Sequence, residues 1–273
     1  FVSHFLMLYK AIFCTFLIAC ISAGDYITQV ASRDGSGGSG LVYLTDTQEY
    51  NGYETNAFYS ITSNPIGHFR VLYPQAQNGS CEGYLRPSRV AKEEGCEYAT
   101  NGGPFVMYQP PGNPTCLGNI VSDGKIVQTQ NTTYVNFGLT KSGDYVMGTL
   151  DDSDIENLDF EQLVTGFGWL VRESVNQVTT SGGEIAPRTA IGTLSNGNMI
   201  IFEADGIEDE YKGLTLMQLS DWLIDIGVYS AINLDGGGSS VTVVNGTIVD
   251  QPSCRDSSFQ CERFVTTMTC IMP

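Results

Sequence analysis

Two aspartates, each directly after an apolar run, are the first candidates for chemistry in this sequence. Asp205 follows residues 198–204 and Asp235 follows residues 229–234, and both runs predict buried strands. Residues 215–227, between them, have the pattern of a helix. Strand, helix and strand of these lengths predict a crossover between parallel strands, so both carboxylates should reach the same edge of a sheet. Open sheets usually bind ligands at that edge, where paired carboxylates can transfer protons or attack a substrate.

A glycine run follows the second aspartate. Residues 233–240 read NLDGGGSS, and three consecutive glycines, Gly236, Gly237 and Gly238, let backbone amides approach a ligand closely. Ser239 adds a hydroxyl suited to phosphate or sugar oxygens. The run is not a nucleotide P-loop, which needs a lysine and a following helix.

The simpler interpretation of the two aspartates is structural. Asp205 precedes Gly206 and Asp235 precedes Gly236, so each could merely open a turn.

Arg188, in the segment PRTAIG, is the candidate for binding phosphate, because a planar guanidinium can hold two oxygens at once. The segment NGGPF at 101–105 contributes Gly102 and Gly103 as further points of close backbone approach. The alternative for Arg188 is a surface ion pair, the commoner role of an arginine in an acidic chain.

The residue inventory excludes several chemistries. Beyond the first 23 residues His68 is the only histidine, and it lies in an apparent strand, so we expect a structural role for it. A histidine-rich zinc site and a Ser-His-Asp triad are therefore disfavoured. The acidic run Asp151, Asp152 and Asp154 is expected to be a solvated loop, with a divalent-cation site as the alternative. We expect no metal and no cofactor, and chemistry carried by carboxylates, arginines, hydroxyls and backbone amides.

The surrounding elements are mostly strands. The helix at 215–227 has Thr215 as cap, Gly227 as terminator and one apolar face. A second, short helix is predicted at Ser88–Glu94, with Ser88 as N-cap and Gly95 as terminator. Strand patterns and hairpins are predicted at 41–45, 57–61, 68–73, 120–127 around Asp123-Gly124, and on both sides of 141–144. We expect an α+β fold: a strand-rich domain built on a mixed β-sheet, with a few helices and one β-α-β crossover near the C-terminus.

The N-terminus and the charge point to the secretory pathway. Lys10, an apolar run and the small residues at 22–24 predict a signal peptide at 1–23. An alternative is a lipoprotein box ending at Cys20, which would anchor the chain. We expect a flexible segment at 24–40 and one domain at 41–273, with no membrane span. The net charge of -17 disfavours nucleic acid as a partner.

Six cysteines lie outside the predicted signal peptide, an even number that favours three disulfides in a secreted chain. Sequons at Asn78, Asn131 and Asn245 agree with passage through a glycosylating compartment. Asn245-Gly246 resembles a hairpin turn, so Asn78 and Asn131 are the better glycan sites.

Taken together, the motifs resemble the phosphodiester glycosidase family. They are, in the family's order, NGGPF, CLGNIVSDG, PRTAIG, EADG, AINLDGGGSS, VNGT and the C-terminal CxxxxxxCxRxVxT. The resemblance runs from about His68 to Met272. It implies an exo-acting hydrolase that removes terminal alpha-N-acetylglucosamine from a phosphate-linked mannose and exposes mannose 6-phosphate. It also implies the bridges Cys81 to Cys116, Cys96 to Cys270 and Cys254 to Cys261.

The family's site, carried onto this chain, predicts particular roles. Arg188 and Arg263 would bind the phosphate, and Asp235 would act as nucleophile or base. Asp205 would position a sugar hydroxyl or assist proton transfer, with the two aspartates exchangeable, and Asn101 would hold the N-acetyl group or a ring hydroxyl. The remaining expected substrate contacts are Gly102, Gly103, Thr189, Gly236, Gly237, Gly238 and Ser239.

One departure keeps other functions open. Pro104 stands where relatives usually have an aromatic residue, which could reshape the sugar pocket. The chain could therefore cleave another phosphodiester-linked sugar, for instance in an extracellular polysaccharide. A third possibility is a non-catalytic, lectin-like binder of phosphorylated glycans.

Overall fold

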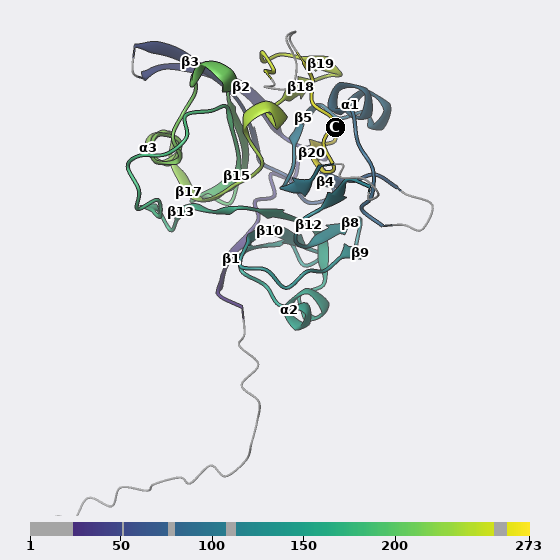
Figure 1. Ribbon diagram of the computed structural model, residues 1–273. Coiled ribbons are helices and arrows are strands. Elements are labelled where there is room, and N and C mark those ends of the chain that lie inside the picture. The colour runs from purple at the N-terminus through teal and green to yellow at the C-terminus, as the bar shows by residue number, and fades with distance from the viewer. Residues whose placement is uncertain (1–23, 51, 76–79, 108–112, 254–260) are drawn as a thin grey trace, which may run out of the picture.

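Three sheets make up most of the molecule (Figure 1), a computed structural model that describes residues 24–50, 52–75, 80–107, 113–253 and 261–273. The first has the strand order β1 (Tyr26–Val30), β11 (Asp144–Gly148), β10 (Val135–Thr140), β12 (Phe160–Gly166), β8 (Ile120–Ser122) and β9 (Lys125–Gln128). The second has the order β14 (Val175–Asn176), β13 (Gly168–Arg172), β17 (Val228–Asn233), β15 (Arg188–Leu194), β16 (Met199–Ala204), β3 (Tyr53–Thr62) and β2 (Leu41–Tyr50). The third has the order β19 (Thr247–Ile248), β18 (Thr242–Val244), β5 (Tyr98–Asn101), β20 (Met268–Ile271) and β4 (Phe69–Leu72).

A short ribbon and a few helices complete the fold. β6 (Phe105–Val106) pairs with β7 (Thr115–Cys116). The α-helices are α1 (Pro87–Glu94), α2 (Asp152–Asn157) and α3 (Leu216–Asp225), and the 3-10 turns are η1 (Glu208–Glu210) and η2 (Gly237–Ser239). The strand-rich expectation is confirmed.

The expectation of a mixed sheet is wrong, because every strand pairing in the described part of the chain is antiparallel. β16 and β17, on either side of α3, are not neighbours: β15 lies between them and pairs antiparallel with both. The two strands therefore run in the same direction. Arg188 of β15 lies opposite Ala204, and Ala190 lies opposite Asn233, so β16 and β17 end at the edge where β15 begins.

The seven-stranded sheet is covered on both faces, which explains why β16 is buried throughout. Ile200 and Phe202 pack with Trp222 of α3, which lies on the outer side of this sheet in Figure 1. Met199 and Ile201 face the opposite way, into a core that all three sheets share. Alternation along the strand therefore decides which face receives each side chain.

Both longer helices have the predicted ends, with one correction. α3 begins at a capping box in which Thr215 and Gln218 exchange side-chain and backbone hydrogen bonds. α1 ends at Gly95 in the left-handed conformation, as expected. Its N-cap is Arg86, not Ser88, because Pro87 already occupies the first turn, where its missing N–H costs no hydrogen bond.

Two segments expected to be irregular are ordered elements. Residues 26–30, within the segment predicted to be flexible, form β1 and pair with β11. The acidic run at 151–154 forms the start of α2, where Asp151 and Asp154 make a capping box. Carboxylates near a helix N-terminus are favourable, which explains the clustering of charge there.

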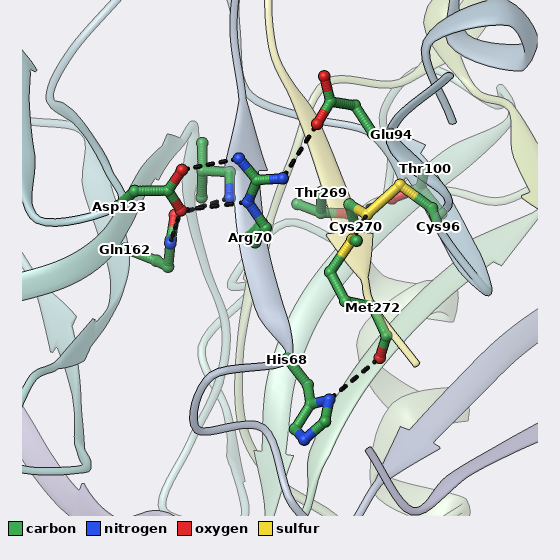
Figure 2. Close-up of a disulfide and its surroundings, with 11 residues drawn as sticks. His68, Arg70, Glu94, Cys96, Thr100, Asp123, Gln162, Thr269, Cys270 and Met272 are labelled. Atoms are coloured by element: carbon green, nitrogen blue, oxygen red, sulfur yellow. Dashed lines mark hydrogen bonds and ion pairs between the residues drawn. A yellow bond between two sulfur atoms is a disulfide. The ribbon is translucent and has the colours of Figure 1, made fainter. Parts of the chain in front are cut away.

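Two of the three implied disulfides are present, Cys81–Cys116 and Cys96–Cys270. The third, Cys254–Cys261, lies outside the described residues. Figure 2 shows Cys96–Cys270 joining the loop after α1 to β20, beside Arg70, which pairs with Glu94 and Asp123.

His68 has the structural role expected for it. Its Nδ1 lies 3.3 Å from the carbonyl oxygen of Met272 (Figure 2) and 2.6 Å from that of Pro273.

Removing Cys96–Cys270 should lower stability more than removing Cys81–Cys116. The first bridge spans 174 residues and the second 35. The loop-closure contribution grows with the logarithm of loop length, so the Cys96→Ala/Cys270→Ala protein should lose about 1.4 kcal/mol more. Thermal unfolding of the two double variants checks this. Equal melting temperatures would contradict it.

The predicted glycosylation and targeting sites are only partly described. Asn131 is exposed after β9, and Asn245 lies with positive φ in the turn between β18 and β19, as its sequence predicted. Asn78 and the predicted signal peptide at 1–23 lie outside the described residues. Among the residues that are described, none of the helices is long and apolar enough to cross a membrane.

Candidate active site

Asp235 lies just beyond β17 and is fixed by the end of β5. Its backbone N–H donates to the carbonyl of Gly102 at 3.0 Å, and the Nδ2 of Asn101 donates to its carbonyl at 2.7 Å. The next residue, Gly236, donates its N–H to the Asp235 carboxylate at 3.0 Å. Burial raises the pKa of Asp235 to about 6, against the opposing effects of the Ser239 hydrogen bond, the Gly236 N–H and the Arg263 charge.

The start of this loop is built around Asn101, which is fully buried. Its Oδ1 accepts from the hydroxyl of Thr189 at 2.9 Å. The next two positions, Gly102 and Gly103, have no space for a side chain. A Cβ at Gly103 would lie 1.9 Å from the carbonyl oxygen of Thr165. Asn101 and Thr189 are therefore held by the fold itself, directly behind Asp235.

Arg263 and Glu208 lie on the other side of the glycine run. Their closest side-chain atoms are 3.5 Å apart, and the side chains are only 17% and 14% exposed. A Cβ on Gly238 would lie 2.4 Å from Nη2 of Arg263, and one on Gly237 would lie 2.7 Å from Oε1 of Glu208. A side chain on either glycine would displace one of these charged groups, and Gly237 also has a positive φ, which favours glycine.

Arg188 lies beneath the same loop but points elsewhere. Its Cδ lies 3.8 Å from the position of a Cβ on Gly236. Its Nε donates to the carbonyl of Leu214 at 3.0 Å, and its Nη2 donates to the carbonyl of Glu184. Burial lowers the pKa of Arg188. Two of its N–H donors are thus used to fix neighbouring loops.

Asp205 lies across β15 from Asp235. Neighbouring strands are about 4.8 Å apart, so the strands leading to the two aspartates are separated by about 10 Å. The Asp205 carboxylate accepts from the N–H of Gln251 at 3.0 Å and lies in a buried group with Glu203 and Asp250. Burial raises its pKa to about 6. Its described contacts are thus different from those of Asp235.

The tertiary structure gathers most of the predicted site residues around Asp235. These are Asn101, Gly102, Gly103, Thr189, Gly236, Gly237, Gly238, Ser239 and Arg263. Two participants were not predicted, Glu208 and Thr267, whose hydroxyl accepts from the N–H of Gly103 at 2.9 Å. The acidic run directly after EADG was the available signal for Glu208, whereas nothing local distinguishes Thr267.

The position that departs from the family pattern is part of the scaffold. Pro104 is buried, and its carbonyl accepts from the N–H of Leu117 at 3.0 Å.

Comparison with known proteins decides the family. A family model described as phosphodiester glycosidase matches residues 94–272. The chain belongs to the phosphodiester glycosidase family. The resemblance inferred from the motifs is therefore confirmed.

Two curated relatives are named N-acetylglucosamine-1-phosphodiester alpha-N-acetylglucosaminidase. The mouse protein is 35% identical over 238 residues, which cover 77% of this chain and 44% of the relative. The human protein is 31% identical over 259 residues, which cover 86% of this chain and 49% of the relative. The chain thus spans about half the length of the curated relatives it matches.

A solved structure agrees in fold. The catalytic domain of the zebrafish enzyme of the same name, described as auto-inhibited by its pro-peptide, superposes with a TM-score of 0.80 at 30% identity. The match covers 91% of this chain and 88% of that one. A hypothetical protein from Synechocystis, at 13% identity, TM-score 0.58 and coverage of 85% and 62%, shares the fold alone.

Proposed function

We propose that this protein hydrolyses a sugar phosphodiester, removing a terminal alpha-N-acetylglucosamine linked through phosphate to mannose. Mannose 6-phosphate would be the product left exposed. The observation that carries the proposal is one carboxylate, Asp235, placed beside the guanidinium of Arg263 at the glycine run. The names of the mouse, human and zebrafish relatives support the substrate.

The proposed chemistry divides between the two halves of the substrate. A phosphate ester leaves more readily than a sugar alcohol, so protonating the leaving oxygen matters less than stabilising its charge. Asp235 acts at the anomeric carbon, as nucleophile or as the base that activates water. The charge of Arg263 and the hydroxyl of Ser239 stabilise the phosphate.

Arg263 is the principal phosphate ligand in this proposal. Its guanidinium lies against Gly238, so a phosphate over the loop meets its positive charge. Arg188, which the sequence also suggested for this role, supports the loop from below through Leu214 and Glu184. It adds positive potential to the same site.

Glu208 takes the role first considered for Asp205. Its carboxylate pairs with Arg263 and lies against Gly237, close to the phosphate position. It can orient Arg263 or accept a hydrogen bond from a sugar hydroxyl. Asp205 then positions the turn that carries Glu208, three residues further along the chain. Asn101, whose Oδ1 and Nδ2 are bonded to Thr189 and Asp235, acts mainly by holding the loop.

One incubation tests the function against its rivals. The protein is mixed with N-acetylglucosamine-1-phospho-6-mannose, and released N-acetylglucosamine and mannose 6-phosphate are measured. Release of both in equal amounts is expected. Release only from other sugar phosphodiesters would show that the substrate is a different sugar. Tight binding without release would indicate a lectin-like protein.

The rate should depend on pH with a midpoint near the pKa of Asp235. Burial raises that pKa to about 6, and only the ionised carboxylate can attack or accept a proton. Below about pH 6 the protonated fraction grows, so kcat/KM should fall about tenfold per pH unit. A pH–rate profile checks this, with circular dichroism at each pH as control. An unchanged rate a full unit below the midpoint would contradict the role of Asp235.

The compartment follows from the same set of observations. We propose that the chain enters the secretory pathway and is secreted or retained in a lumen of the Golgi or lysosomal type. The two disulfides agree with an oxidising compartment.

A further inference from the structure

Three carboxylates form a buried group on the inner side of the seven-stranded sheet. Glu203, Asp205 and Asp250 each offer an oxygen within 4.8 Å of the others. Their exposures are 0%, 8% and 5%. Acidic side chains are almost never buried to this extent without a partner.

Two features of the fold bring the three carboxylates together: the alternation of side chains along β16, and the segment after β19, which comes back beside the end of β16. Glu203 points the same way as Met199 and Ile201, into the core shared by the sheets. Asp205 follows at the end of β16, and Asp250 lies just beyond β19, where it meets both.

Three of the six carboxylate oxygens in this group are buried without a hydrogen bond. Neither oxygen of Asp250 has a hydrogen bond of good geometry among the described residues, and Oε1 of Glu203 has none either. The other Glu203 oxygen has only a 3.4 Å contact with the hydroxyl of Thr242. Unpaired buried oxygens cost more than a lost hydrogen bond, and unpaired charges cost far more. A bound cation would supply the partner that these oxygens lack.

The charges that act on these groups are mutually repulsive. Burial raises the pKa of Asp250 to about 8, with the charge of Asp205 adding to it and backbone hydrogen bonds opposing it. Burial also raises the pKa of Glu203, with added repulsion from Asp250 and Asp205. A cation would remove both penalties at once.

We propose that Glu203, Asp205 and Asp250 bind one divalent cation, with Ca²⁺ as the best fit. Carboxylate oxygens are the preferred ligands of hard cations, and Ca²⁺ takes them at variable angles and numbers. Two ligands about 2.4 Å from one Ca²⁺ lie no more than about 4.8 Å apart, which this group satisfies. The sequence raised a divalent cation only at Asp151, Asp152 and Asp154, and the expectation of no metal did not consider these buried carboxylates.

A route to the site exists on the Asp250 side. A cavity of about 340 Å³ is lined by Arg86, Ile248, Asp250, Pro252, Cys261 and Glu262, and the charge of Arg86 is paired with Glu262. A hydrated cation can enter there, and the same cavity can supply the water ligands that Ca²⁺ commonly keeps.

Binding would fix the turn that carries Glu208. The N–H of Glu208 donates to the hydroxyl of Ser253 at 3.1 Å, and that hydroxyl donates to the carbonyl of Gly206 at 3.2 Å. A cation between Asp205 and Asp250 joins the same two segments a few residues away. It would therefore position Glu208, and through it Arg263, without touching the substrate.

The test measures Ca²⁺ binding directly. Full-length protein is stripped with EDTA, and Ca²⁺ binding at pH 7 is followed by calorimetry and thermal unfolding. We expect one Ca²⁺ per chain and a rise in melting temperature of about 5 °C at saturating Ca²⁺. Mg²⁺ should give a smaller rise, because it dehydrates reluctantly.

Two variants locate the site, and one serves as control. Asp250→Asn and Glu203→Gln should each abolish the stoichiometric binding and the rise in melting temperature. In EDTA they should be at least as stable as the unchanged protein, since each removes a buried acid. Asp152→Asn, which removes an exposed acid on α2, should keep the full response.

The outcome is decisive in either direction. Absence of stoichiometric binding in the unchanged protein, or full binding retained in both site variants, would overturn the proposal. Should one variant not fold, the other variant and the stoichiometry of the unchanged protein still decide. None of these readouts uses glycosidase activity, so failure of the proposed function would leave this test intact.

Discussion

Asp235→Asn should lower the turnover of N-acetylglucosamine-1-phospho-6-mannose by about a hundredfold or more, with substrate binding largely kept. Asn has nearly the same shape and can still accept from the N–H of Gly236, but it cannot attack carbon or accept a proton. The loss should therefore appear in kcat rather than KM. Single-turnover measurement of released N-acetylglucosamine checks this.

Stability separates this effect from misfolding. The folded-state pKa of Asp235, about 6, lies above the ordinary value of 3.8. Stability from such a shift is fully present below about pH 3.8 and is lost as pH rises through about 6, so at pH 7 the ionised carboxylate is destabilising. Asp235→Asn should thus melt at the same or a higher temperature. Asp225→Asn, an exposed change at the end of α3, is the matched control and should keep full activity. Near-normal turnover in Asp235→Asn would show that another group performs the chemistry.

Arg263→Lys should reduce kcat/KM for the phosphodiester by about a hundredfold to a thousandfold. Lysine keeps the positive charge but loses the planar fork that binds two phosphate oxygens. Arg263 is only 17% exposed and lies against Gly238, so no neighbouring solvent can replace its hydrogen bonds. Hydrolysis of the phosphodiester by the two proteins, compared at the same pH, measures the loss.

A substrate without phosphate shows whether the loss of activity in Arg263→Lys comes from lost phosphate binding. An aryl alpha-N-acetylglucosaminide has no phosphate for Arg263 to bind, so its hydrolysis should fall by less than about tenfold. Equal losses on both substrates would show that Arg263 supports the site only structurally. Arg89→Gln breaks a surface pair with Glu93 on α1 and should affect neither substrate.

Local signals in the sequence predicted the elements well. Thr215 and Gly227 bound a helix because a side-chain hydroxyl and a missing Cβ act within one turn of chain. Asp123-Gly124 and Asn245-Gly246 form turns because both residues of each pair adopt positive φ. Strand pairing was not predictable in the same way: β15 forms a hairpin with β16, but it also pairs with β17, which lies beyond α3, and so separates the two strands.

In the candidate site, too, the sequence predicted some residues and the tertiary structure was needed for others. The family motifs identified Asp235, the glycine run and Arg263 before any coordinates, because their types and order are specific. Glu208 was missed, and Arg188 and Asp205 turned out to have different neighbours, because the direction of a side chain depends on packing contacts from other segments.

The sequence by itself determined the family, the local elements and which residue types are available for chemistry, since these depend on short-range pattern and composition. Only the tertiary structure decided which charges meet. Arg263 reaches Glu208 and the glycine loop, Arg188 is bound to backbone carbonyls, and Asp205 joins Glu203 and Asp250. Electrostatic interactions depend on distance through space and on burial, and neither is encoded in the spacing of residues along the chain.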